Sequence, residues 1–74
     1  MHMFISDAEL LERRKQYPTG RRVRLVSMND PYSHLKPGDL GTITGVDDIG
    51  TIHISWDCGS SLGAVYKEDI IELI

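Results

Sequence analysis

Three aspartates, Asp47, Asp48 and Asp57, are the residues of this 74-residue chain whose carboxylates could hold a hard cation. Calcium takes about six to eight oxygen ligands. No loop around these aspartates offers closely spaced oxygen ligands in that number. Aspartates in hairpin turns usually accept hydrogen bonds from local backbone groups. We therefore predict turn-stabilising aspartates and no metal site.

The thiol and hydroxyl groups lack the neighbours that nucleophilic catalysis needs. Cys58 follows Asp57, which is a carboxylate and not a base that would favour a reactive thiolate. Ser60 and Ser61 have none of the flanking residues of a nucleophile elbow. We predict no catalytic nucleophile among them.

Two histidines could serve as ligands or as proton carriers. His34 has no cysteine or second histidine at ligand spacing, so we expect a surface residue. His53 lies between Ile52 and Ile54, and alternation along a strand then points it away from the core. Together with the preceding residues, this predicts a protein that is not an enzyme and holds no cofactor.

The composition predicts one small globular domain. Apolar residues make up 41% of the chain and charged residues 26%, which is ordinary for a folded protein. A single cysteine excludes an internal disulfide and fits a reducing compartment. No apolar run reaches the roughly 18 residues that cross a bilayer. We expect a cytoplasmic protein with no membrane partner.

A helix is predicted over Ser6 to Gln16. Ser6 and Glu9 have the spacing of a capping box, and Ile5 and Leu10 that of a hydrophobic staple. Pro18 ends the helix, because the residue before a proline is pushed out of helical geometry. We assign residues 1–18 to this helical segment and residues 19–74 to a β-barrel, within a single domain.

The apolar face of that helix is narrow, formed by Ala8, Leu10 and Leu11. A helix of about three turns is marginal alone in water. The sequence therefore predicts that this face docks on the barrel or on another subunit.

Alternating apolar residues predict short strands after Gly20. In the first strand Val23 and Leu25 form the core side. A long irregular loop over 29–38 follows, and then further strands at Leu40 to Val46, Thr51 to Trp56, Leu62 to Tyr66 and Ile70 to Leu73. Ile52, Ile54 and Trp56 share a phase, which predicts a buried Trp56. Gly50 and Gly59 fall where tight turns need a left-handed residue.

Five short strands with a long first loop resemble an SH3-like barrel. The runs Met28–Pro31, Gly41–Asp57 and Gly59–Gly63 resemble the domain-of-unknown-function family number 4314, whose members are small and chiefly bacterial. The resemblance covers about Tyr17 to Leu73, and Cys58 departs from it at a position suited to asparagine or aspartate. It implies a mainly β, five-stranded SH3-like barrel with an N-terminal α-helix, and no established activity or cofactor.

Two kinds of partner are compatible with these residues. Tyr32 and Tyr66 could line an aromatic groove beside the long loop, as in SH3-like folds that bind extended peptides. Alternatively, a basic strip in the first 24 residues could contact phosphates; it consists of Arg13, Arg14, Lys15, Arg21, Arg22 and Arg24. The remaining chain holds two basic and eight acidic residues, which disfavours nucleic acid.

We therefore predict a binding or adaptor module whose partner is another protein, with a homo-oligomer as one form of it. The residues expected at the interface are Tyr32, Tyr66, Arg21, Arg22 and Arg24. A nucleic-acid-binding module that uses the basic strip is the alternative.

Overall fold

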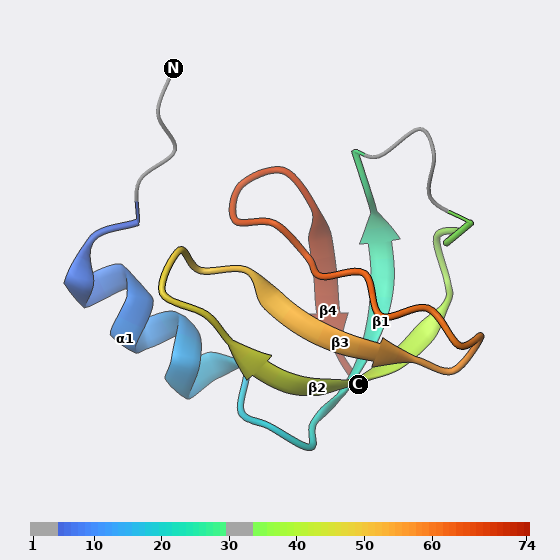
Figure 1. Cartoon of the computed structure of the whole chain (residues 1–74), viewed down its shortest axis with the longest axis horizontal. Helices are drawn as coiled ribbons and strands as arrows, with labels where there is room; N and C mark the ends of the chain where they lie inside the picture. Colours follow the sequence, from blue (N-terminus) through green and yellow to red (C-terminus); the bar gives the residue numbers. More distant parts are fainter. Residues whose placement is uncertain (1–4, 30–33) are drawn as a thin grey trace.

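A computed structural model describes residues 5–29 and 34–74. It contains one helix and an antiparallel sheet of four strands in the order β3-β2-β1-β4 (Figure 1). The elements are α1 (Asp7–Gln16), β1 (Arg22–Ser27), β2 (Leu40–Val46), β3 (Ile52–Trp56) and β4 (Ile70–Leu73). The predicted helix and four of the five predicted strands are confirmed, and the sheet is open at its β3 and β4 edges.

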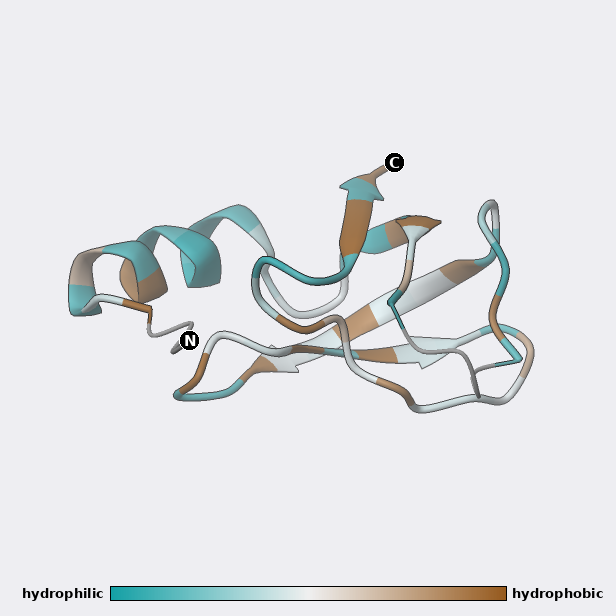
Figure 2. Ribbon diagram, turned by 90° about the horizontal axis from the view of Figure 1, so that it is seen from above, coloured by the Kyte–Doolittle hydropathy of each residue, from teal (hydrophilic) through white to brown (hydrophobic). Residues whose placement is uncertain are grey.

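The core lies on one face of this sheet. Its buried side chains are Val23, Leu25, Leu35, Ile43, Ile52, Ile54, Trp56, Ala64 and Ile71. Figure 2 shows the corresponding apolar segments along the strands, whereas the helix is mostly hydrophilic. Trp56 is only 2% exposed, so its predicted place in the core is confirmed. The predicted inward-facing residues of β1 and β3 are thus confirmed.

Two irregularities bend the sheet. The register between β2 and β3 shifts between Ile43 and Gly45, and the register between β1 and β4 shifts between Leu25 and Ser27. Bulges of this kind add twist and bend a strand. In Figure 1, β1 and β4 accordingly run across the direction of β2 and β3, which curls the sheet around its core.

The strand predicted over Leu62 to Tyr66 was wrong. Only Ala64 pairs with β3, through two backbone hydrogen bonds with Ile52 at 2.9 and 2.8 Å. The backbone carbonyl of Leu62 accepts instead from the Trp56 indole Nε1 at 2.7 Å. This bond turns the chain toward the indole before Ala64, so a longer ladder beside β3 does not form.

The local signals of the helix and of the turns are confirmed. Ser6 caps α1, and its side chain and that of Glu9 form the reciprocal bonds of a capping box. Gly50 and Gly59 have φ values of 84° and 97°, which glycine adopts without steric cost. Within the described residues, no helix is long and apolar enough to cross a membrane.

The predicted docking of the helix on the sheet through its apolar face was wrong, whereas docking of this face on another subunit stays a prediction. No residue of α1 is buried, and Leu11 is 56% exposed. The helix is attached by other side chains, which are described next.

Candidate functional site

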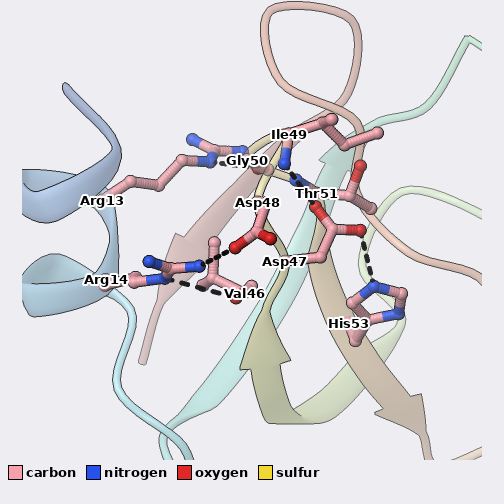
Figure 3. Close-up of polar contacts among 9 residues, drawn as sticks. All are labelled: Arg13, Arg14, Val46, Asp47, Asp48, Ile49, Gly50, Thr51 and His53. Carbon is pink, nitrogen blue, oxygen red and sulfur yellow. Dashed lines mark hydrogen bonds and ion pairs between the residues drawn. The ribbon is translucent and has the colours of Figure 1, made fainter. Parts of the chain in front are cut away.

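Two arginines attach α1 to the turn between β2 and β3. Arg13 Nε donates to the backbone carbonyl of Gly50 at 2.6 Å. Arg14 donates to the Asp48 carboxylate at 2.9 Å and to the Val46 carbonyl at 3.4 Å (Figure 3). These contacts fix the helix to the hairpin by hydrogen bonds that span more than thirty residues of sequence.

Apolar contact with this turn comes from Ile5, which precedes the helix. A Cβ placed on Gly50 would lie 2.9 Å from Ile5 Cδ1, closer than carbon atoms tolerate. Gly50 therefore has two functions, a left-handed turn conformation and a close approach of Ile5.

Two tyrosine rings lie against the Arg13 guanidinium. Its Cζ is 5.4 Å from the ring centroid of Tyr17 and 5.2 Å from that of Tyr66, within the range of cation–π attraction. Burial lowers the pKa of Arg13, and the two tyrosines oppose that shift in part. Arg13 is therefore a partly desolvated cation held between aromatic and backbone groups.

The Tyr66 hydroxyl donates a short hydrogen bond to the Glu9 carboxylate. This bond raises the pKa of Tyr66 and lowers the pKa of Glu9, because it favours the protonated phenol and the ionised carboxylate. Tyr66, predicted as an interface residue, thus takes part in holding the helix. Tyr32, predicted as its companion, lies outside the described residues.

The β2–β3 turn is organised by one aspartate. Asp47 Oδ1 accepts from the backbone N–H groups of Ile49 and Thr51 at 3.1 and 3.0 Å, as predicted for an aspartate in a turn. Asp47 Oδ2 lies 2.9 Å from His53 Nε2 (Figure 3). Partial burial raises the pKa of Asp47, but the bonds from His53, Thr51 and Ile49 outweigh it, so the pKa lies below its ordinary value.

His53 is exposed, as predicted, but the sequence analysis missed its pairing with Asp47. The two residues are six apart in the sequence and lie on opposite sides of a tight turn. That spacing could have indicated the pair. Within residues 5–29 and 34–74, no three His, Cys, Asp or Glu side chains gather as metal ligands would.

The face of the sheet opposite the core, here called the outer face, carries two internal ion pairs. Arg22 donates to both Asp57 oxygens, at 2.7 and 2.5 Å, and to the Thr42 hydroxyl at 2.9 Å. Arg24 donates from Nε to the Glu72 carboxylate at 2.6 Å. The bond between Arg22 and Asp57 raises the pKa of the arginine and lowers that of the aspartate.

Two residues of the predicted basic strip take part in these ion pairs. Arg22 and Arg24 are engaged by carboxylates 35 and 48 residues away, which the sequence alone did not indicate. Arg21 is exposed, and its side chain makes no hydrogen bond or ion pair with the part of the chain that the structure describes.

Three exposed aliphatic side chains lie on the outer face beside the ion pairs. Val26 is 42% exposed, Leu40 37% and Ile70 55%. Strand pairing places Leu40 opposite Arg24, and Ile70 opposite Ser27, the residue after Val26. The outer face therefore combines exposed aliphatic side chains with internally neutralised charges and with polar residues such as His53 and Ser55.

A family model described as "Domain of unknown function (DUF4314)" matches residues 6–74. The chain belongs to the DUF4314 family. The comparisons with curated proteins and with solved structures found no match. The DUF4314 match begins at Ser6, the N-cap of α1, so the family's domain includes the helix as well as the sheet.

In this DUF4314 domain the described interface candidates lie in two places. Arg22 and Arg24 lie on the outer face, whereas Tyr66 contacts α1 through Glu9 and Arg13. The structure therefore presents two separate surfaces, the outer face and the junction between α1 and Tyr66.

Proposed function

We propose that this DUF4314 domain is a binding module without catalytic activity of its own, and that its outer face docks on a protein. The observation that supports this is the pairing of Arg22 with Asp57 and of Arg24 with Glu72 beside exposed aliphatic side chains. Exposed apolar groups rimmed by polar residues are typical of protein interfaces. The partner is accordingly a protein with an apolar contact surface, a second copy of the chain included.

A nucleic-acid partner has less support. Phosphate binding depends on cations that are free to replace counterions. Here Arg14, Arg22 and Arg24 each bond to a carboxylate of the same chain. Contact with phosphate would first have to break those bonds, so the basic strip favours the protein partner.

We also propose that the curled sheet is an SH3-like barrel. Its support is the Ala64 bridge, which adds a fifth short segment beside β3, and the crossing of β1 and β4 over β2 and β3. Hydrogen exchange measures this directly: the amide of Ala64 should be protected about as strongly as those of β3. Rapid exchange at Ala64 would remove the support for a fifth barrel segment.

The function is tested by capture from an extract of the source cells, with the wild-type domain and a Val26→Ser/Ile70→Ser variant as baits. We expect specific proteins on the wild-type bait that are lost on the variant, and sedimentation of the purified chain reports a second copy as the partner. Leu11→Gln is the control, because Leu11 is about as exposed as Ile70 but lies on the helix. Capture of nucleic acid, or proteins retained equally by both baits, would contradict the proposal.

A further inference from the structure

Arg13 is a partly desolvated cation whose hydrogen bonds are incomplete. A guanidinium has five N–H donors in a planar fork. Only Nε is engaged, by the Gly50 carbonyl. Within the described residues, the two Nη groups donate to no acceptor, although tyrosine rings hold the fork in place. The free Nη donors of this restrained guanidinium can therefore bind a planar acceptor such as a carboxylate.

The neighbouring carboxylates do not fill this role, because each has a partner of its own. Glu9 accepts from the Tyr66 hydroxyl and from the backbone N–H of Ser6. Glu12 lies 3.8 Å from the ammonium of Lys15. A further cation, Lys67, lies over the Tyr66 ring at 5.4 Å.

A pocket of about 280 Å³ opens beside Arg13. Its lining consists of Ala8, Glu9, Glu12, Arg13, Gln16 and Tyr66. The pocket is shallow and open to solvent, so it suits an end group such as a side chain and not a fully enclosed ligand. Ala8 and the Tyr66 ring supply apolar contact, and the Gln16 amide supplies a further donor.

We propose that this pocket binds a carboxylate on a short aliphatic stem, the side chain of a glutamate or aspartate on the partner protein. The Nη groups of Arg13 donate to the two carboxylate oxygens, a fork-to-fork geometry that is strong and selective. The stem lies against Ala8 and Tyr66. The Glu9 and Glu12 carboxylates repel any anion, and they repel a doubly charged phosphate more strongly than a carboxylate with a single charge. This proposal rests on the proposed function, since it gives the protein partner an acidic residue.

The experiment uses a small probe, so that it does not depend on finding the partner. The full chain is titrated with N-acetyl-glutamate α-amide and followed by NMR at the Arg13 Nε–H and at the Tyr66 ring. We expect saturable shifts in the millimolar range, and about tenfold weaker binding of N-acetyl-glutamine α-amide, which offers a neutral acceptor. Equal binding of the two probes, or no binding of the glutamate probe, would overturn the proposal. Acetate binding as tightly as the glutamate probe would overturn the role of the stem.

Variants separate binding from folding. Arg13→Gln should abolish the shifts, but it also removes the bond to Gly50. Ala8→Phe therefore serves as a second variant, because it fills the pocket, leaves the guanidinium in place and alters an exposed residue. Lys36→Gln removes the same charge at a remote exposed turn and should leave probe binding unchanged. Undiminished binding to folded Ala8→Phe would contradict the site.

The two proposals fail separately. Probe binding without any captured protein overturns the proposed function and the protein source of the carboxylate, and it supports the carboxylate site itself. Capture of a protein through the outer face, without binding of the probe, overturns the carboxylate site and leaves the proposed function standing.

Discussion

The indole Nε1 of Trp56 donates to the backbone carbonyl of Leu62 at 2.7 Å, across the turn that follows β3. Trp56 is buried among Ile43, Ile54 and their neighbours. One side chain therefore both fills the core and determines the course of the chain between β3 and Ala64.

Replacing Trp56 tests these two roles separately. Trp56→Ala should lower the free energy of unfolding by about 3–5 kcal/mol, because it leaves a large cavity. Trp56→Phe keeps most of the apolar contact and leaves the Leu62 carbonyl without its donor, so we expect a smaller loss of about 1–3 kcal/mol. Urea denaturation measures both values. An unchanged midpoint for Trp56→Ala would mean that the indole is not a core residue in solution.

Gly41 should be intolerant of any side chain. A Cβ there would lie 2.5 Å from Ile54 Cγ2 and 2.9 Å from Trp56 Cε3. Gly41→Ala should therefore cost about 1–3 kcal/mol of unfolding free energy through overpacking. Gly45→Ala is the matched control on the same strand, because nothing lies within 4 Å of its Cβ. Equal midpoints for the two variants in denaturant would refute the steric argument.

Stability should fall in acid, in part through Asp47. Its pKa is lower in the folded protein than in the unfolded chain, so its contribution is complete above the unfolded value of about 4 and is lost as the pH falls through the folded value. Glu9 and Asp57 have lowered pKa values too and act in the same direction. Unfolding measured from pH 2 to pH 7 should show a shallower acid slope for Asp47→Asn. An unaltered slope would show that the Asp47 bonds do not persist in solution.

The exposed face of the helix should be insensitive to polar substitution. Leu11→Gln should change the unfolding free energy by less than about 0.5 kcal/mol, as for surface positions in general. Ser6→Ala removes the N-cap and should cost about 1 kcal/mol. Thermal unfolding of both variants gives the comparison. A large loss for Leu11→Gln would restore the apolar docking that the sequence predicted.

Releasing the outer-face arginines should create salt-dependent binding to DNA. In the Asp57→Asn/Glu72→Gln variant, Arg22 and Arg24 lose their carboxylate partners. Each freed phosphate contact adds about −0.9 to the log–log salt slope, so a slope near −2 is expected for the variant. Fluorescence anisotropy with duplex DNA measures it, and we expect no binding by the wild type at physiological salt. Wild-type binding of equal strength would favour the nucleic-acid alternative.

The sequence sufficed for features that depend on near neighbours. The Ser6–Glu9 capping box, the left-handed conformation of Gly50 and Gly59 and the inward phase of Trp56 are encoded within a few residues, and all were predicted. The strand over Leu62 to Tyr66 was mispredicted because a tertiary bond to an indole overrides local β propensity.

The candidate surfaces were harder to predict, because their contacts depend on strand register and on residues far apart in the sequence. Arg24 meets Glu72 only because β1 and β4 pair in one particular register. Arg13 and Arg14 favour a helix C-terminus electrostatically, but their bonds to the β2–β3 turn follow from how the helix folds back. The pattern of charges in the sequence therefore predicted neither the Arg24–Glu72 pair nor the bonds of Arg13 and Arg14 to the turn.

The attachment of α1 by hydrogen bonds, with none of its residues buried, has a consequence for local unfolding. Detaching the helix exposes little apolar surface, so the opening depends weakly on denaturant concentration. It also requires less free energy than disrupting the strands. The amides of α1 should then exchange with deuterium through a sub-global opening of their own, at rates that urea hardly alters, while the sheet remains protected until the whole domain unfolds.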